Sequence, residues 1–190
     1  MFTMAIADLS CPTQPNTGSN NPNPGFVGQM IASQRLGRGA MPSRLGLSKT
    51  AFARMARSYR LQTTHPSGSG VPQHDLFLTP ERNDLLYLLD DHGTVVQHEV
   101  LWMASIVATG YIGPDTLWAN LGLRGEEELD RLMLHNFRTL AQRNAGHVEW
   151  KEFLRCQLCE QEGIIPAAPS VRLARRGHLF GLGLERPVMP

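Results

Sequence analysis

The sequence predicts an all-α protein, a single domain of five or six short helices with a disordered amino-terminal tail. From residue 48 onward, apolar side chains recur every three or four residues, and no useful stretch alternates apolar with polar side chains as a strand does. With 190 residues, 42% of them hydrophobic, the chain is long enough for one globular domain and too short for two large ones. We place the domain at residues 28–181 and a carboxy-terminal tail at residues 182–190.

The first 27 residues are predicted to form the disordered tail. The run from Pro12 to Gly25 consists almost wholly of Pro, Asn, Gly, Ser and Thr. Such a segment buries too little apolar area to offset the conformational entropy that ordering removes. The pattern changes at Gln29, so the domain is expected to begin next to it.

Two helices are predicted in the first half of the domain. One begins at Ser48, a good N-cap, and exposes arginines on its other sides. Its apolar side carries Phe52, Met55, Ala56 and Tyr59. A linker rich in Gly, Ser and Pro follows at residues 65–73. The next helix has Thr79 as N-cap and Pro80 at its first position, and Gly93 ends it.

A buried helix and a short one are expected next. The buried helix ends at Gly110 or Gly113, and its apolar residues follow in steps of four, three and four. They are Val96, Val100, Met103 and Val107. Pro114 and Asp115 then open a short helix that Gly122 closes.

Two longer amphipathic helices complete the domain. The first carries three glutamates at residues 126–128, where the positive end of the helix dipole favours them, and Gly146 breaks it. The second spans about residues 148–161, and Gly163 stops it. Their apolar stripes are Leu129, Leu132, Met133, Phe137 and Leu140, and then Trp150, Phe153, Leu154 and Leu158.

The net charge of +1 conceals three blocks of different charge. Residues 1–75 carry seven basic and two acidic side chains, residues 76–162 seven basic and fourteen acidic, and residues 163–190 four basic and one acidic. A nucleic-acid or anionic-surface binder that uses the arginines of residues 35–60 is therefore one open hypothesis. We nevertheless expect neither nucleic acid nor a membrane as partner, because a solvated basic helix flank accounts for this pattern.

The location is predicted from the cysteines and from hydropathy. Three cysteines without an apolar signal segment favour a reducing compartment, so we expect a cytoplasmic protein. The longest mostly apolar stretch, residues 100–112, is shorter than the roughly 18 to 20 residues that cross a bilayer. No membrane span is expected.

The candidate metal ligands are Cys156 and Cys159. They form a Cys-x-x-Cys motif in the last helix, about 60° apart at roughly 100° per residue, and we place both on the face away from Trp150. Two thiolates do not complete a zinc site or an iron–sulfur cluster. The further ligands considered are Cys11, His147 and His178. Two small thiols packed against another helix remain the alternative interpretation.

The remaining chemical patterns do not indicate catalysis. There is no phosphate-binding Gly-Lys-Ser/Thr loop, dinucleotide fingerprint, His-Glu-x-x-His or Gly-x-Ser-x-Gly motif. His98 and Glu99 are either a proton-handling pair or satisfied structural groups of a buried helix. We therefore do not expect an enzyme.

Several stretches resemble the NifQ family of nitrogen-fixation proteins. Residues 117–123 contain the family's Leu-Trp and Leu-Gly-Leu, and a Glu-Leu helix then ends at Phe137 and is followed by Asn144. Residues 148–159 read Val-Glu-Trp-Lys-Glu-Phe-Leu-Arg-Cys-Gln-Leu-Cys, where the family has Met-x-Trp-Lys-Lys-Phe-Phe-Tyr-Arg-Gln and a Cys. The resemblance covers about residues 29–181.

The resemblance implies a cytoplasmic protein that carries a molybdenum–iron–sulfur cluster and delivers molybdenum to iron–molybdenum cofactor assembly. Its partners would be the nitrogenase cofactor-assembly proteins. The family's cluster is associated with a carboxy-terminal Cys-x4-Cys-x2-Cys-x5-Cys run. Here the four cysteine places hold Pro166, Val171, Ala174 and either Leu179 or Phe180.

This departure argues against the cluster. Iron–sulfur clusters need thiolate ligands, and none of the replacing side chains donates an electron pair. Only Cys159 occupies a family cysteine position, while Cys156 replaces an Arg, and the paired lysines become Lys151 and Glu152. Two hypotheses follow: molybdenum delivery with impaired cluster binding, or a metal-free helical adaptor that binds a partner of cofactor assembly.

Overall fold

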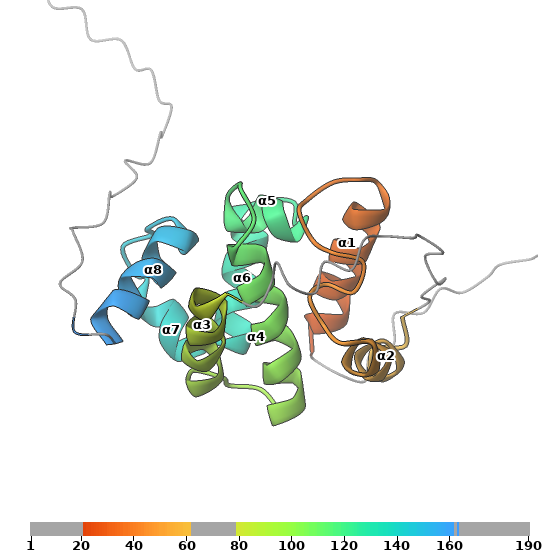
Figure 1. Ribbon diagram of the computed structural model, residues 1–190, viewed down its shortest axis with the longest axis horizontal. Coiled ribbons are helices and arrows are strands. Elements are labelled where there is room, and N and C mark those ends of the chain that lie inside the picture. Colours follow the sequence, from red (N-terminus) through yellow and green to blue (C-terminus); the bar gives the residue numbers. More distant parts are fainter. Residues whose placement is uncertain (1–20, 62–78, 162, 164–190) are drawn as a thin grey trace, which may run out of the picture.

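The computed structural model describes residues 21–61, 79–161 and 163 (Figure 1). Within these ranges it contains eight helices and no strand, which confirms the all-α prediction with slightly more helices than expected. They are α1 (Asn23–Arg35), α2 (Lys49–Ser58), α3 (Pro80–Asp91), α4 (Gln97–Tyr111), α5 (Leu117–Leu121), α6 (Glu126–Asn136), α7 (Arg138–Arg143) and α8 (Trp150–Gln161).

Helix α4 lies in the middle of the molecule (Figure 1). Helices α1 and α2 lie on one side of it and α7 and α8 on the other, while α3 packs along it. Most of its side chains are buried, including the predicted Val100, Met103 and Val107. Val96 is an exception: it is the N-cap residue and 58% exposed, because it precedes the helix.

Helix α1 corrects the predicted end of the tail at residue 27. The helix already begins at Asn23, and Phe26 and Val27 are buried in the core together with Met30. The composition of this segment indicated a tail, but proline is favourable in the first helical turn and three apolar side chains suffice to anchor the helix. Residues 1–20, and the predicted linker at 65–73, lie outside the described residues.

The helix predicted from residue 126 to the Gly146 break is two helices. Its chain bends at Phe137, whose side chain is fully buried. The carbonyl of Asn136 accepts a hydrogen bond from the Thr94 amide at 2.8 Å. The end of α6 thus coincides with a hydrogen bond to a residue distant in the sequence, and the local sequence has neither glycine nor proline at this point.

Gly122 closes α5 as predicted, in the left-handed conformation with φ 74°. A Cβ atom there would lie 2.6 Å from Cβ of Ser33, so the turn also allows α1 to approach. The Ser33 hydroxyl donates to the Gly122 carbonyl at 2.6 Å. This contact fixes α1 against the segment that opens α6.

No helix in the described ranges is both long and apolar enough to span a membrane.

Candidate functional site on helix α8

Helix α8 carries both candidate metal ligands, and the carboxylates of Glu149 and Asp130 position its first turn. The Glu149 carboxylate accepts from the backbone amides of Lys151 at 3.0 Å and Glu152 at 3.3 Å, satisfying two of the helix's free donors. The Trp150 indole donates to the Asp130 carboxylate at 2.6 Å. The predicted apolar stripe is confirmed, since Trp150, Phe153, Leu154 and Leu158 are all buried.

The two thiols occupy different environments. Cys156 is buried at 5% exposure, whereas Cys159 is partly exposed. The expectation that both lie outside the buried face is therefore wrong for Cys156. The reason is that the neighbouring structure covers more of α8 than its aromatic stripe, and Gln157 is buried as well.

The electrostatics of Cys156 favour the thiol over the thiolate. Burial raises its pKa, and the charges of Glu152, Cys159 and Glu160 raise it further, while Arg155 lowers it. Because the thiolate is the form that binds a metal, ligation by Cys156 would require the loss of the thiol proton. Whether Cys156 and Cys159 bind a metal stays a prediction.

The other proposed ligands do not complete a site in the part of the chain that is described. No three His, Cys, Asp or Glu side chains of these residues are grouped so that they could hold a metal ion. His147 lies in the turn before α8, with φ 50°. Cys11, His178 and the four family cysteine places lie outside the described residues.

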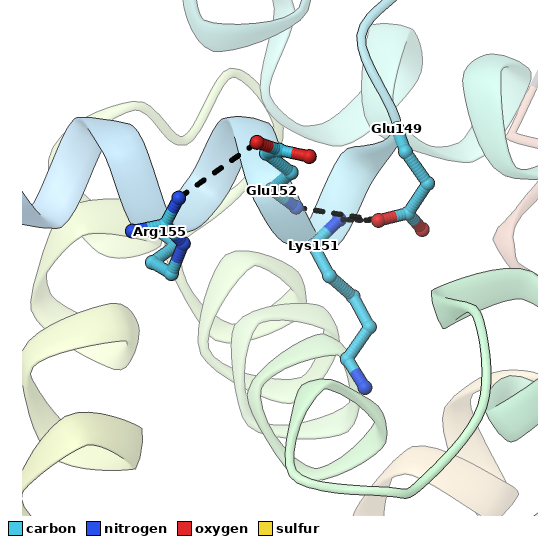
Figure 2. Close-up of polar contacts among 4 residues, drawn as sticks. All are labelled: Glu149, Lys151, Glu152 and Arg155. Atoms are coloured by element: carbon cyan, nitrogen blue, oxygen red, sulfur yellow. Dashed lines mark hydrogen bonds and ion pairs between the residues drawn. The ribbon is translucent and has the colours of Figure 1, made fainter. Parts of the chain in front are cut away.

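A pocket of about 610 Å³ adjoins the first turns of α8. Figure 2 shows how the α8 side chains diverge, with Arg155 toward Glu152 at 3.8 Å and Lys151 away from both. The remaining lining residues come from the α4–α5 region and the turn before α8: Tyr111, Pro114, Asp115, Thr116 and Glu149.

Lys151 connects α8 to the loop between α4 and α5. Its ammonium group donates to the carbonyl oxygens of Gly113 at 2.6 Å and Asp115 at 2.8 Å. It also lies 5.9 Å from the centre of the Tyr111 ring. The cation is thus bound by the protein itself, which makes it a structural group of this site.

The pocket does not suit an oxyanion. Three carboxylates line it, from Asp115, Glu149 and Glu152, against the cations of Lys151 and Arg155. The Tyr111 hydroxyl donates a hydrogen bond to Glu81 at 2.9 Å. Burial is the larger cause that raises the pKa of Tyr111, and this hydrogen bond raises it further. A site with excess negative charge, whose lysine is already engaged, gives little attraction to molybdate.

Sequence reasoning missed a buried amide and carboxylate cluster between α1, α4 and α6. Glu99 accepts from the side-chain amides of Asn21 at 2.8 Å and Asn23 at 3.2 Å, and Asn23 exchanges two hydrogen bonds with Asn136 at 2.8 Å. His98 does not join Glu99 and instead packs on Trp102, with the two ring centroids 4.9 Å apart. The structure therefore supports the structural interpretation of Glu99.

Comparison with known proteins connects this fold to a family. A family model for NifQ matches residues 26–172, which include almost all of the helical region. The chain belongs to the NifQ family. This membership supports an accessory role in nitrogen fixation.

Three NifQ relatives illustrate the range of similarity. The chain is 34% identical over 149 residues to "Protein NifQ" of Azotobacter vinelandii, covering 73% of this chain and 76% of that protein. It is 31% identical over 145 residues to "Protein NifQ homolog" of Sinorhizobium fredii (strain NBRC 101917 / NGR234), covering 76% and 59%. "Protein NifQ" of Klebsiella pneumoniae is 29% identical over 142 residues, covering 70% and 83%. No solved structure matches the chain.

The extent of the NifQ match bears on the cysteine places. The matched range ends at residue 172, so it includes Pro166 and Val171 but not Ala174. NifQ similarity therefore persists into a segment where the resemblance leads us to expect two cysteines and this chain has Pro166 and Val171.

Proposed function

We propose that the protein serves molybdenum delivery for iron–molybdenum cofactor assembly, with impaired binding of the cluster that the NifQ resemblance implies. Family membership supports the delivery role. The observation that carries the proposal is the arrangement of α8: its Trp-Lys segment is anchored through Asp130 and the α4–α5 loop without any contribution from a thiolate.

The residues present do not fit the family's molybdenum–iron–sulfur cluster. The places of its four thiolates hold side chains without a donor atom, and the raised pKa of Cys156 disfavours its thiolate. Cys159 alone stands at a family cysteine place and is partly exposed. One thiolate does not hold a cluster, so we route no step of delivery through one.

A metal-free adaptor in cofactor assembly is the second candidate function. One observation favours it: several large apolar side chains of the helical surface remain exposed, although the core is well filled. They are Tyr87 at 68%, Leu134 at 48% and Leu101 at 43%. Such side chains are available for contact with a protein partner of the assembly pathway.

Metal analysis of the full-length protein separates the two functions. The protein is purified without oxygen after expression with ample molybdate and iron, and both metals are measured per chain. The delivery function predicts a measurable molybdenum content per chain, which falls when Cys159 is replaced by Ser. Cys156 is tested as Cys156→Ala, because the hydroxyl of a serine at this buried position would have no assigned acceptor. Glu127→Gln, on α6, serves as the surface control.

The adaptor predicts a different result. Metal would be substoichiometric in every variant, yet the protein would restore nitrogen-fixing growth to a host that lacks its own NifQ. Absence of metal together with absence of rescue would contradict both functions. Stoichiometric molybdenum and iron that survive both cysteine substitutions would instead overturn our account of the ligands.

A further inference from the structure

The charges of the fold are divided between its two sides. Residues 21–61, which form α1, α2 and their connection, contain seven basic side chains and no acidic one. All seven are exposed: Arg35, Arg38, Arg44, Lys49, Arg54, Arg57 and Arg60. Residues 79–161 contain thirteen acidic and seven basic side chains. The α1–α2 side of the molecule in Figure 1 is therefore strongly basic and the remainder acidic.

A groove lies where the basic side meets α4. It has a volume of about 410 Å³ and is lined by Thr50, Ala51, Arg54, His98, Leu101 and Trp102. Arg54 provides its positive charge, and in the described ranges no carboxylate forms an ion pair with this guanidinium. Leu101 exposes 43% of its surface there.

The apolar wall of this groove is already fixed in position. Trp102 is 9% exposed, and its ring packs nearly perpendicular to those of His98 and Tyr59, with centroid separations of 4.9 Å and 5.7 Å. A ligand would therefore meet a preformed surface and would not have to order it, which lowers the entropic cost of binding.

We propose that the α2–α4 groove binds an acidic segment of a protein partner that also carries an apolar side chain. A carboxylate of the segment pairs with Arg54, and its apolar side chain covers Leu101 and Trp102. The surrounding arginines attract the segment from a distance. This inference deepens the proposed function by naming the surface through which the protein meets a partner of cofactor assembly.

The groove suits such a segment better than a nucleic acid. A long polyanion that extended beyond α2 onto the rest of the described fold would meet residues 79–161, where thirteen acidic side chains outnumber seven basic ones. The apolar Leu101 and Trp102 offer a duplex backbone no partner. A short acidic segment obtains the attraction of the basic side without meeting that repulsion.

Peptide binding to the full-length protein tests the proposal. The probe is a fluorescein-labelled peptide, Glu-Glu-Leu-Asp-Glu-Phe-Leu-Glu-Glu, and its binding is followed by fluorescence anisotropy. One control peptide replaces the acids by Gln and Asn, and a second replaces Leu and Phe by Ser. Both controls are expected to bind more weakly than the probe, because each removes one of the two required chemistries.

Matched variants locate the binding surface. Arg54→Gln is expected to weaken probe binding about tenfold, the loss of one charged hydrogen-bonding partner. Leu101→Glu places in the groove a negative charge that repels the acidic probe, and it is expected to weaken probe binding at least as much. Arg131→Gln, at an exposed position of α6, makes the same change of residue type as Arg54→Gln and should alter affinity by no more than about twofold.

Several outcomes would overturn the proposal. These are equal loss in the groove and α6 variants, undiminished binding of the peptide without Leu and Phe, or displacement of the probe by duplex DNA at lower concentration than by unlabelled peptide. Concentration-dependent self-association abolished by Arg54→Gln would assign the groove to a second copy of this chain. Metal content does not enter this experiment, so its failure leaves the delivery role unaffected.

Discussion

The role assigned to Lys151 can be tested by replacing it with methionine. Lys151→Met keeps the apolar length of the side chain and removes the ammonium group that donates to the carbonyl oxygens of Gly113 and Asp115. A hydrogen bond to a charged group contributes about 1.5 to 3 kcal/mol where it is buried. One of these two is partly buried and the other exposed, so the pair together is expected to contribute about 2 kcal/mol.

That loss is measurable by denaturation with urea. A decrease of about 2 kcal/mol in the free energy of unfolding corresponds to a fall in Tm of about 4 to 8 °C for a chain of this size. Lys151→Arg should recover part of the loss, since a guanidinium also donates to carbonyl oxygens. Arg131→Met, on the exposed side of α6, controls for loss of a surface cation.

The result also distinguishes a structural lysine from one that binds molybdate. If Lys151→Met left the free energy of unfolding within about 0.5 kcal/mol of the original protein, the reasoning from its two hydrogen bonds would be refuted. Reduced molybdenum content with unchanged stability would point instead to a ligand-binding role.

Three further predictions follow from single positions. Gly46→Ala should destabilise the fold by more than about 1 kcal/mol in urea denaturation, because φ is 80° and the added Cβ would lie 2.0 Å from Oγ1 of Thr109; unchanged stability would contradict this. Burial lowers the pKa of His135 below its ordinary 6.5, so the folded state disfavours the imidazolium and the free energy of unfolding falls as the pH drops below 6.5. In urea denaturation, His135→Gln should therefore show a smaller fall in this free energy between pH 7 and pH 5. An identical pH profile would refute this reasoning. Cys156→Ser should lower Tm more than Cys159→Ser, since only Cys156 is buried, and the reverse order would show that the burial argument is wrong.

The fold class and most helices followed from local signals in the sequence. Helical spacing predicted the stripe of α8, and the N-cap at Ser48 is confirmed by its hydrogen bond from the Ala51 amide at 3.2 Å. These features are local because a cap or an amphipathic stripe involves residues only a few positions apart.

The features that were missed depend on contacts between distant residues. Helix α1 is fixed partly by Asn23, whose amide reaches Glu99 and Asn136, 76 and 113 positions further along the chain. Periodicity carries no information about such pairs. The burial of Cys156 likewise depends on how neighbouring structure covers α8, which the sequence of α8 does not specify.

The candidate site was predictable in composition but not in arrangement. The motif analysis identified Cys156, Cys159 and Lys151, yet only the fold shows that Lys151 holds a loop and that Cys156 favours its neutral thiol. No local pattern singled out the α2–α4 groove, because its lining comes from two helices that residues 59–96, including all of α3, separate in the sequence.

The anchoring of α8 explains how a NifQ scaffold can persist where the family's thiolates are absent. A structural metal site contributes its binding energy to folding, so a domain that depends on its cluster loses stability when the ligands are replaced. Here the described contacts of α8 include a buried apolar stripe, the Trp150–Asp130 hydrogen bond, the Arg143–Gln157 hydrogen bond and the Lys151 connection. None of these requires a metal. We therefore expect that replacement of the cysteines leaves the described fold, and with it the proposed α2–α4 groove, intact.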